Sequence, residues 1–235
     1  MKQFFPLFFA LFTLLSCASR IEGSLAADGS AALSVSMSLE PRMTALIRSL
    51  SAAGGRTEGP VLDGPAIAMS MLNAPGVASV SLRNTAPAAV EGRVQISRIS
   101  EFLSAADSRA GARFITFQQE QRGGRCQISI NRQYGPEILE LLSSEIADYL
   151  NALMAPIATG EEMTKSEYLE LVALFYNQTI SNEIAGSRIL ASLEFPGQVT
   201  AARGGTFSGR RASFNIPLLD LLVLETPMVY EVTWN

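Results

Sequence analysis

The sequence predicts an α+β fold in which a mainly antiparallel sheet carries amphipathic helices packed on one face. Several segments alternate strictly between apolar and polar residues, which is typical of strands with one buried and one solvated face. Other segments place apolar residues at helical spacing, which predicts helices with a single apolar stripe. Strands with one apolar face suit an antiparallel sheet covered by helices on one side, and the 235 residues contain no internal repeat.

The N-terminal part is predicted as a strand followed by two helices. Residues 31–39 alternate between apolar and small polar side chains, which indicates a half-buried strand. Its apolar face consists of Leu33, Val35, Met37 and Leu39. Pro41 fits the first turn of a helix over 41–53. Asp63 is a suitable N-cap for a second helix over 64–73.

The middle of the chain is predicted as two strand pairs with a helix between them. The predicted strands cover residues 77–83, 90–98, 112–120 and 124–132. The helix covers 99–107 and contributes Phe102 and Leu103 to the core. The loop at 121–125 closes the second pair into a hairpin, whose second strand places Cys126 on its apolar face. Such a cysteine is predicted to be a core residue.

The C-terminal part is predicted as two long helices followed by strands. An apolar stripe predicts a helix from residue 137 to residue 154. After a loop at 156–163, Thr164 and Glu167 stand at capping-box spacing and open a helix to residue 183. Strands are predicted over 187–195, 205–215 and 227–234, with an apolar turn or short helix at 217–225. Because these last strands can pair with the first one, residues 25–235 are predicted to form one domain.

The N-terminus has the pattern of a secretory signal. Lys2 precedes an uncharged apolar run from Phe4 to Leu15, which is shorter than the roughly 20 residues that a membrane-spanning helix needs. The run closes on Leu14, Leu15, Ser16 and Cys17. This ending resembles the lipobox of bacterial lipoproteins; the alternative is an ordinary signal peptide with an incidental cysteine.

The lipobox resemblance implies that residues 1–16 are a cleaved signal peptide and that residues 17–24 are a lipidated cysteine with a short tether. The Cys17 thiol would carry diacylglycerol, and its amino group a further acyl chain such as palmitate. Several acyl chains together give stable anchoring, at about 0.8 kcal/mol for each buried methylene. Ala18 and Ser19 stand where an aspartate would favour retention at the inner membrane. We therefore expect a lipid-anchored envelope protein, with the outer membrane favoured over the inner.

Composition removes many catalytic options. The chain has no histidine, which removes histidine-based triads and most zinc sites. Lys165 is the sole lysine beyond the signal, and no serine precedes it at the offset of a serine-lysine hydrolase. Beyond residue 16, 17 basic residues stand against 22 acidic ones, so nucleic acid is not an expected partner. We predict no catalytic activity, no cofactor and no metal site.

Arginines concentrate in the middle of the chain. Residues 83–133 carry eight arginines against four acidic residues, whereas residues 134–235 carry five basic against thirteen acidic residues. Five of these arginines fall on or beside predicted strands: Arg93, Arg113, Arg122, Arg125 and Arg132. A shared arginine face would suit anionic lipid headgroups or an acidic partner. Alternatively, these arginines pair with the acidic helix of the same chain.

The apolar residues suggest a lipid-sized cavity or, equally well, a solid core. The aromatic residues concerned are Phe114, Phe117, Phe195, Phe207, Phe214 and Trp234. An early strand after the lipid cysteine, interior helices and a closing strand PMVYEVTW over 227–234 resemble LppM-like envelope lipoproteins, which implies an α+β domain with lipid binding. We therefore expect a non-catalytic lipoprotein that binds a lipid or other apolar ligand between sheet and helices. The alternatives are a structural or protein-interaction module of the envelope and, with less support, a hydrolase.

Replacing Cys17 with alanine tests the anchor. Because the thiol is the proposed acceptor of diacylglycerol, Cys17→Ala should abolish labelling by a fatty-acid probe. The variant should leave the membrane fraction or accumulate as uncleaved precursor. Persistent labelling of the variant would show that the lipid is not on Cys17.

Overall fold

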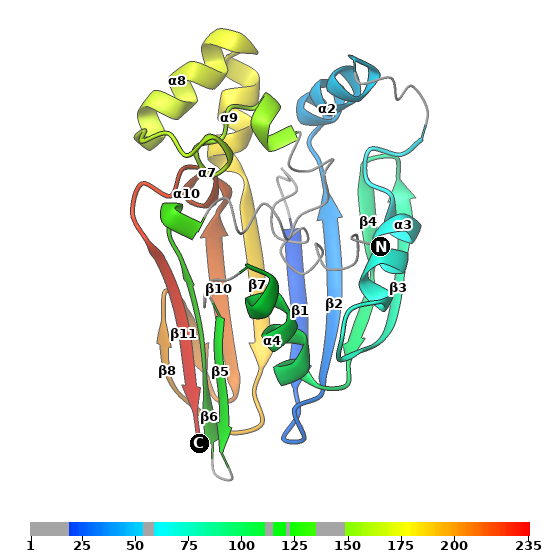
Figure 1. The fold of residues 1–235 in the computed structure, drawn as a ribbon, viewed down its shortest axis with the longest axis vertical. Coiled ribbons are helices and arrows are strands. Elements are labelled where there is room, and N and C mark those ends of the chain that lie inside the picture. The colour runs from blue at the N-terminus through cyan, green and yellow to red at the C-terminus, as the bar shows by residue number, and fades with distance from the viewer. Residues whose placement is uncertain (1–18, 54–58, 111–114, 121–122, 135–148) are drawn as a thin grey trace.

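Two β-sheets face each other in the computed structural model, which describes residues 19–53, 59–110, 115–120, 123–134 and 149–235 (Figure 1). Within these ranges the strands form a seven-stranded sheet A, in the order β3-β4-β2-β1-β7-β10-β9, and a four-stranded sheet B, in the order β5-β6-β11-β8. The α+β class and the mainly antiparallel pairing are confirmed. The strands divide between two sheets, where the sequence predicted one.

The elements have the following bounds. Sheet A contains β1 Ser19–Leu25, β2 Ala31–Ser38, β3 Val77–Ala86, β4 Ala89–Ile96, β7 Arg188–Glu194, β9 Thr206–Ser208 and β10 Arg211–Pro217. Sheet B contains β5 Ile115–Glu120, β6 Gly123–Ile130, β8 Val199–Arg203 and β11 Met228–Trp234. The helices are α2 Pro41–Ala53, α3 Gly64–Leu72, α4 Ile99–Ala110, α7 Pro156–Thr159, α8 Lys165–Phe175, α9 Gln178–Gly186 and α10 Leu218–Val223, with a 3-10 turn at Arg132–Tyr134.

The prediction of a tether over 17–24 is wrong from Ser19 onward, because these residues form β1 in the interior of sheet A. β1 pairs antiparallel with β2 and parallel with β7. Its side chains alone are a weak strand signal, since Arg20, Glu22 and Gly23 interrupt the apolar residues. The two neighbouring strands satisfy its backbone hydrogen bonds on both sides, so tertiary pairing decides its conformation.

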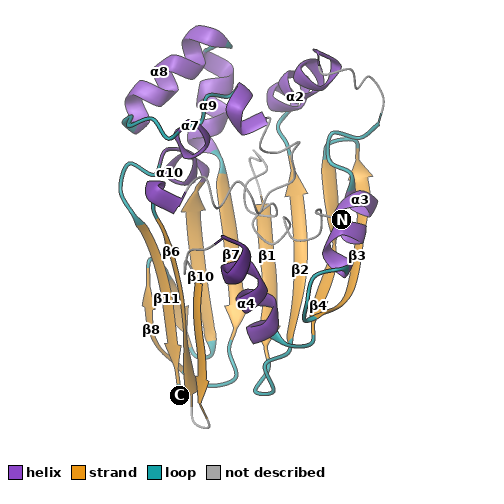
Figure 2. Cartoon of the chain, viewed as in Figure 1, coloured by secondary structure: helices purple, strands orange, loops and turns teal. Residues whose placement is uncertain are grey.

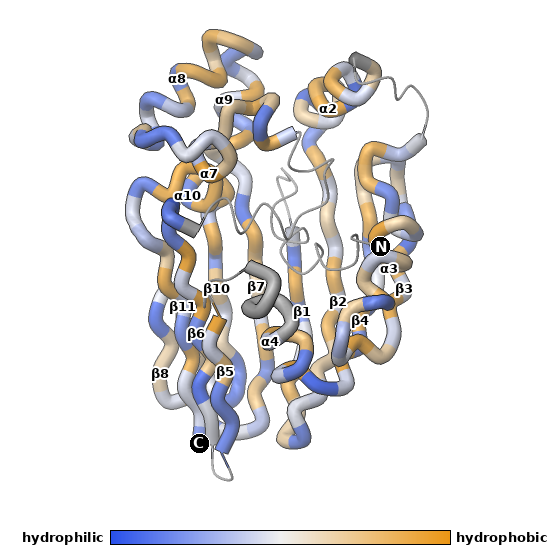
Figure 3. The backbone as a smooth tube through the Cα atoms, in the orientation of Figure 1, coloured by the Kyte–Doolittle hydropathy of each residue, from blue (hydrophilic) through white to orange (hydrophobic). Residues whose placement is uncertain are grey.

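Sheet A has one covered face and one open face. Its inner face carries buried side chains, among them Ile21, Leu33, Val35, Val94 and Ile189. Sheet B covers this face over β7 and β10, while α4 lies in front of β7 and β1 and α3 lies beside β3 and β4 (Figures 1 and 2). Both helices are on the same side of the sheet, as predicted. The outer face alternates with the inner one and is mainly polar: β2 contributes Ser34 and Ser36 to it, and β4 contributes Glu91 and Arg93. The colour of the tube changes between hydrophobic and hydrophilic along the strands of sheet A (Figure 3).

The remaining helices gather at the upper end of the strands (Figure 2). Met43 at the start of α2 donates its backbone N–H to the Glu183 carboxylate of α9, at 2.9 Å. Among the described residues, no helix has the length and the apolar character needed to cross a membrane.

Apart from β1, the sequence predicted most elements close to their observed bounds. The loop predicted over 156–163 begins with the helix α7, Pro156–Thr159. The helix predicted over 164–183 is two helices, because the Asn177 side chain accepts a hydrogen bond from Ile180 N and starts α9. The strand predicted over 205–215 is a hairpin of β9 and β10, with Gly209 at φ 59° in its turn. β8 was not predicted, because its residues do not alternate between apolar and polar side chains. Of the helix predicted from 137 to 154, residues 137–148 lie outside the described residues.

Gly92 provides a test of the sheet A packing. In β4 it lies opposite Val35 of β2 and Leu82 of β3, and a Cβ there would overlap the backbone oxygen of Ser81. We expect Gly92→Ala to lower the free energy of unfolding by about 1–3 kcal/mol in urea titrations. The matched control is Gly186→Ala at the end of α9, where an added Cβ would have no heavy atom within 4 Å apart from its chain neighbours and its own helix backbone. Equal stability of the two variants would contradict the close approach at Gly92.

Candidate functional site

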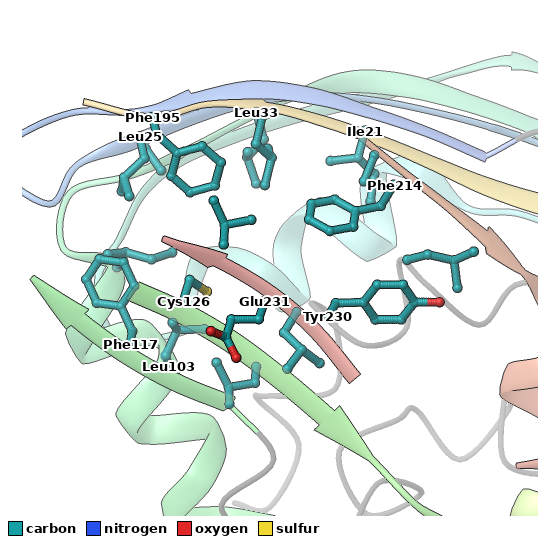
Figure 4. Close-up of a pocket in the computed structure, with 18 of the residues that line it drawn as sticks. Ile21, Leu25, Leu33, Leu103, Phe117, Cys126, Phe195, Phe214, Tyr230 and Glu231 are labelled. Carbon is teal, nitrogen blue, oxygen red and sulfur yellow. The ribbon is translucent and has the colours of Figure 1, made fainter. Parts of the chain in front are cut away.

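An apolar cavity of about 170 Å³ lies between sheets A and B (Figure 4). Sheet A and the residue after β7 contribute Ile21, Leu25, Leu33, Leu193, Phe195 and Phe214. Sheet B contributes Phe117, Cys126, Ile128, Ile130, Tyr230 and Val232. Two helices complete the lining, α4 with Ile99 and Leu103 and α10 with Leu221. The prediction of a site between sheet and helices is therefore corrected: the principal walls are two sheets.

The space arises because each wall has a small residue at its centre. Across sheet A, Ala191 of β7 lies between Ile21 of β1 and Phe214 of β10. Across sheet B, Cys126 of β6 lies between two larger side chains, Phe117 of β5 and Val232 of β11. A row of large, small and large residues leaves space over the small one, and each of the two walls contains such a row.

Aromatic contacts border the cavity along its length. Phe195 and Phe117 pack against Trp234 with ring centroids 4.9 Å and 6.2 Å away. Phe214 and Tyr230 meet edge to face at 5.7 Å, an arrangement that the quadrupoles of the rings favour. Of the predicted aromatic set, Phe207 instead lies exposed on β9, and Phe114 lies outside the described residues.

Cys126 faces the cavity, as its place on the apolar side of the strand predicted. Burial raises the pKa of its thiol from 9.0 to about 11, because desolvation disfavours the thiolate. Burial likewise raises the pKa of the Tyr230 hydroxyl above its usual range. Both groups are neutral near pH 7, which preserves the apolar character of the wall.

The structure does not bring the described members of the predicted arginine set together. Arg93 is exposed on the outer face of sheet A, beside Ser34 and Ser81 in the neighbouring strands. Arg125 is on the far face of sheet B and pairs with Glu231 at 2.8 Å. These two arginines therefore lie on different sheets.

Arg132 binds backbone carbonyl groups at the helical end of the fold. Its guanidinium donates to the backbone oxygens of Met163 and Val223, at 3.3 and 3.4 Å. The guanidinium of Arg132 also lies 3.9 Å from the Glu162 carboxylate. Arg125 and Arg132 therefore pair with acidic residues of the same chain, but these residues lie in β11 and in a loop and not in the predicted acidic helix. Cys17, Arg113 and Arg122 lie outside the described residues.

Other polar groups considered in the sequence have structural partners. Lys165 donates to Asp220 of α10 at 2.9 Å, and this hydrogen bond raises the pKa of its ammonium group. Thr164 and Glu167 form the predicted capping box, which lowers the pKa of the Glu167 carboxyl through the bond from Thr164 N. No group of three or more His, Cys, Asp or Glu residues suited to a metal occurs in the ranges that the structure describes.

Comparisons with known proteins add one structural likeness. No family model matches the chain, and no curated protein matches it. Among solved structures it is similar to the folded domain of the LppM protein of Mycobacterium tuberculosis, determined by NMR, with 11% sequence identity and a TM-score of 0.41. The match covers 94% of this chain and 91% of that one.

Cys126 should react slowly with alkylating reagents in the folded protein. With a pKa of about 11 in place of 9.0, its thiolate fraction at pH 8 is about 100-fold smaller than in the unfolded chain. The same shift lowers stability as pH rises from 9 toward 11, because the unfolded state then loses the proton first. Mass spectrometry after timed iodoacetamide treatment, with and without urea, measures the ratio of the alkylation rates of Cys126 in the unfolded and the folded chain. Equal rates in both states would refute the burial of this thiol.

Proposed function

We propose that the protein is a lipoprotein of the bacterial cell envelope, anchored through Cys17, that binds an apolar ligand such as a lipid acyl chain without catalysing a reaction. The observation that carries the ligand part is the unfilled apolar cavity between the two sheets. The lipobox-like ending of the N-terminal apolar run supports the anchor. Ala18 and Ser19, which stand after Cys17 where an aspartate would favour the inner membrane, support an outer-membrane location.

The energetics favour a ligand over an empty cavity. Protein interiors are close-packed, and an internal void costs about 24 cal/mol for each Å³. For about 170 Å³ this penalty amounts to roughly 4 kcal/mol. An apolar molecule that fills the space recovers this contact energy.

The size and chemistry of the walls define the ligand class. An apolar cavity of about 150 Å³ holds a molecule such as benzene, so this one suits a single ring or a segment of one acyl chain. Among the lining residues, polar side-chain atoms belong to Ser24, Cys126, Tyr230 and Glu231. The Glu231 carboxylate is already paired with Arg125. A charged headgroup therefore has no partner inside and would stay at the protein surface.

A second candidate is a protein-interaction module, which a groove on the outer face of sheet A favours. This groove has a volume of about 550 Å³. Its lining includes Arg20, Glu22, Leu190, Ser192 and Asn215. Leu190 is exposed there, and the mixture of charged, polar and apolar groups suits a polypeptide surface.

Native mass spectrometry distinguishes these two functions. Protein from residue 18 onward, purified without detergent, should carry additional mass that organic extraction removes and that lipid analysis identifies as acyl-chain compounds. Protein without added mass that also fails to bind a fluorescent fatty acid would exclude the carrier and leave the interaction module.

Filling the cavity should abolish ligand binding without loss of stability. Ala191→Leu adds three carbon atoms at the centre of one wall, so we expect loss of the bound ligand and an unchanged or higher free energy of unfolding. The control is Ala212→Leu, at a fully buried alanine that does not line the cavity. Overpacking there should cost about 1–3 kcal/mol. Comparable destabilisation by both substitutions in urea titrations would mean that the core around Ala191 is solid.

A further inference from the structure

The junction of α8 and α9 lies at the upper extremity of the molecule (Figure 1), and two large apolar side chains are exposed there. We call residues 171–182 the α8–α9 corner. α8 buries Tyr168 and Val172 against the core, and its last two residues point away from that face. Leu174 is 80% exposed and Phe175 is 61% exposed. Two adjacent side chains of this kind are costly to leave in water, since a buried leucine or phenylalanine gains about 1.5–3 kcal/mol.

The corner is a fixed part of the fold. The hydroxyl of Tyr176 donates to the backbone oxygen of Ala152. Asn177 accepts from Ile180 N at 2.9 Å and caps the start of α9, while Ser181 donates to the oxygen of Leu169 at 2.9 Å and joins the two helices. The apolar pair is therefore held in position at the tip.

Charges around the corner suit a lipid surface. Residues 171–182 include no charged side chain. The flanking Glu170, one turn before Leu174 in α8, is exposed and would have to stay on the aqueous side of the interface. The neighbouring helix α2 carries exposed Arg42 and Arg48 and no acidic residue. Arginines beside an apolar tip match an interface where anionic headgroups surround the acyl region.

The start of the described chain lies at the same end of the fold. β1 is parallel to β7, with Ser19 opposite Ile189, and β7 begins directly after α9. The chain therefore enters β1 from the helical end. Cys17 is two residues earlier, and two residues span at most about 7 Å.

The short distance to Cys17 constrains how the domain can sit at a membrane. α9 has nine residues and is about 13 Å long at 1.5 Å per residue. It extends from the start of β7 toward the upper end (Figure 1). The corner therefore reaches about 6 Å further toward the bilayer than the backbone of an anchored Cys17 can. Interfacial apolar groups are buried by about 5–10 Å, which is the same range.

We propose that the anchored protein inserts Leu174 and Phe175 of the α8–α9 corner into the interfacial region of the bilayer that holds Cys17. This inference rests on the proposed anchor at Cys17. Insertion would fix the orientation of the domain, with α2, α8 and α9 toward the lipid and the Trp234 end of the sheets away from it.

Tryptophan fluorescence of the full-length lipidated chain tests this orientation. The lipidated Phe175→Trp variant is reconstituted in vesicles of phosphatidylethanolamine and phosphatidylglycerol. The acyl chains of these lipids carry bromine near the glycerol end. The introduced indole should be quenched, with roughly a twofold loss of its emission relative to unbrominated vesicles. The native Trp234 is 3% exposed and contributes the same background to every variant.

Phe207→Trp is the matched control, because Phe207 is also an exposed phenylalanine. Phe207 of β9 lies opposite Ala212 of β10, which in turn lies opposite Leu193 of β7. Leu193 is four residues further along β7 than Ile189. This places Phe207 about 13 Å beyond the level of Ser19, on the side away from the helices. Its emission should be unchanged by brominated lipid.

Two readouts separate failure of the inference from failure of the anchor. A fatty-acid probe on the Phe175→Trp chain, with Cys17→Ala as the blank, reports whether the anchor is present. If the chain is labelled but its introduced tryptophan is not quenched, the proposed insertion of the corner is wrong and the anchor stands. If a concentration-dependent dimer forms under those conditions, Leu174 and Phe175 contact a second copy of the chain instead. A chain that shows no label in its wild-type form would overturn the anchor and this inference with it.

Discussion

β1 pairs with β2 on one side and with β7 on the other, and these two ladders join the beginning of the described chain to its C-terminal third. Without β1, β2 and β7 would each lose a hydrogen-bonded neighbour inside sheet A. The strands that follow β7 then supply β10 to the same sheet and β11 to the opposite one. The position of β1 therefore determines both the continuity of sheet A and the surface on which sheet B packs.

The cavity follows from this arrangement. Two twisted sheets in contact need complementary side chains to fill the space between them. Here Ala191 and Cys126 each lie between two larger residues of their own sheet, and these larger residues hold the walls apart. Trp234 and its aromatic neighbours pack the end that lies away from the helices. The hollow is therefore a property of the strand registers.

The proposed anchor, the cavity and the exposed corner are compatible with one orientation at a membrane. The parallel alignment of β1 with β7 brings the N-terminal entry and the α8–α9 corner to the same end of the fold. A domain tethered there would keep the outer face of sheet A available to partners. The proposed ligand and the proposed lipid contact thus use different parts of the molecule, the interior between the sheets and the helical tip.

Local patterns were sufficient for most elements. The alternation in β2, the Asp63 cap of α3 and the capping box at Thr164 were readable because each depends on residues close together in the chain. β1 was not readable, since its conformation depends on pairing with residues 31–36 and 189–194. The break at Asn177 was missed because an asparagine at this place is compatible with a continuing helix as well as with a new cap.

For the candidate site the division is similar. The sequence by itself determined the lipobox-like ending at Cys17, the absence of histidine and the apolar side of Cys126, because these are matters of composition and local periodicity. It also indicated an apolar interior. Only the tertiary structure decided that the cavity lies between two sheets, that Arg93 and Arg125 occupy different sheets and that the exposed corner shares an end with the chain entry. Each of these depends on strand order and register, which bring together residues that are distant in the chain.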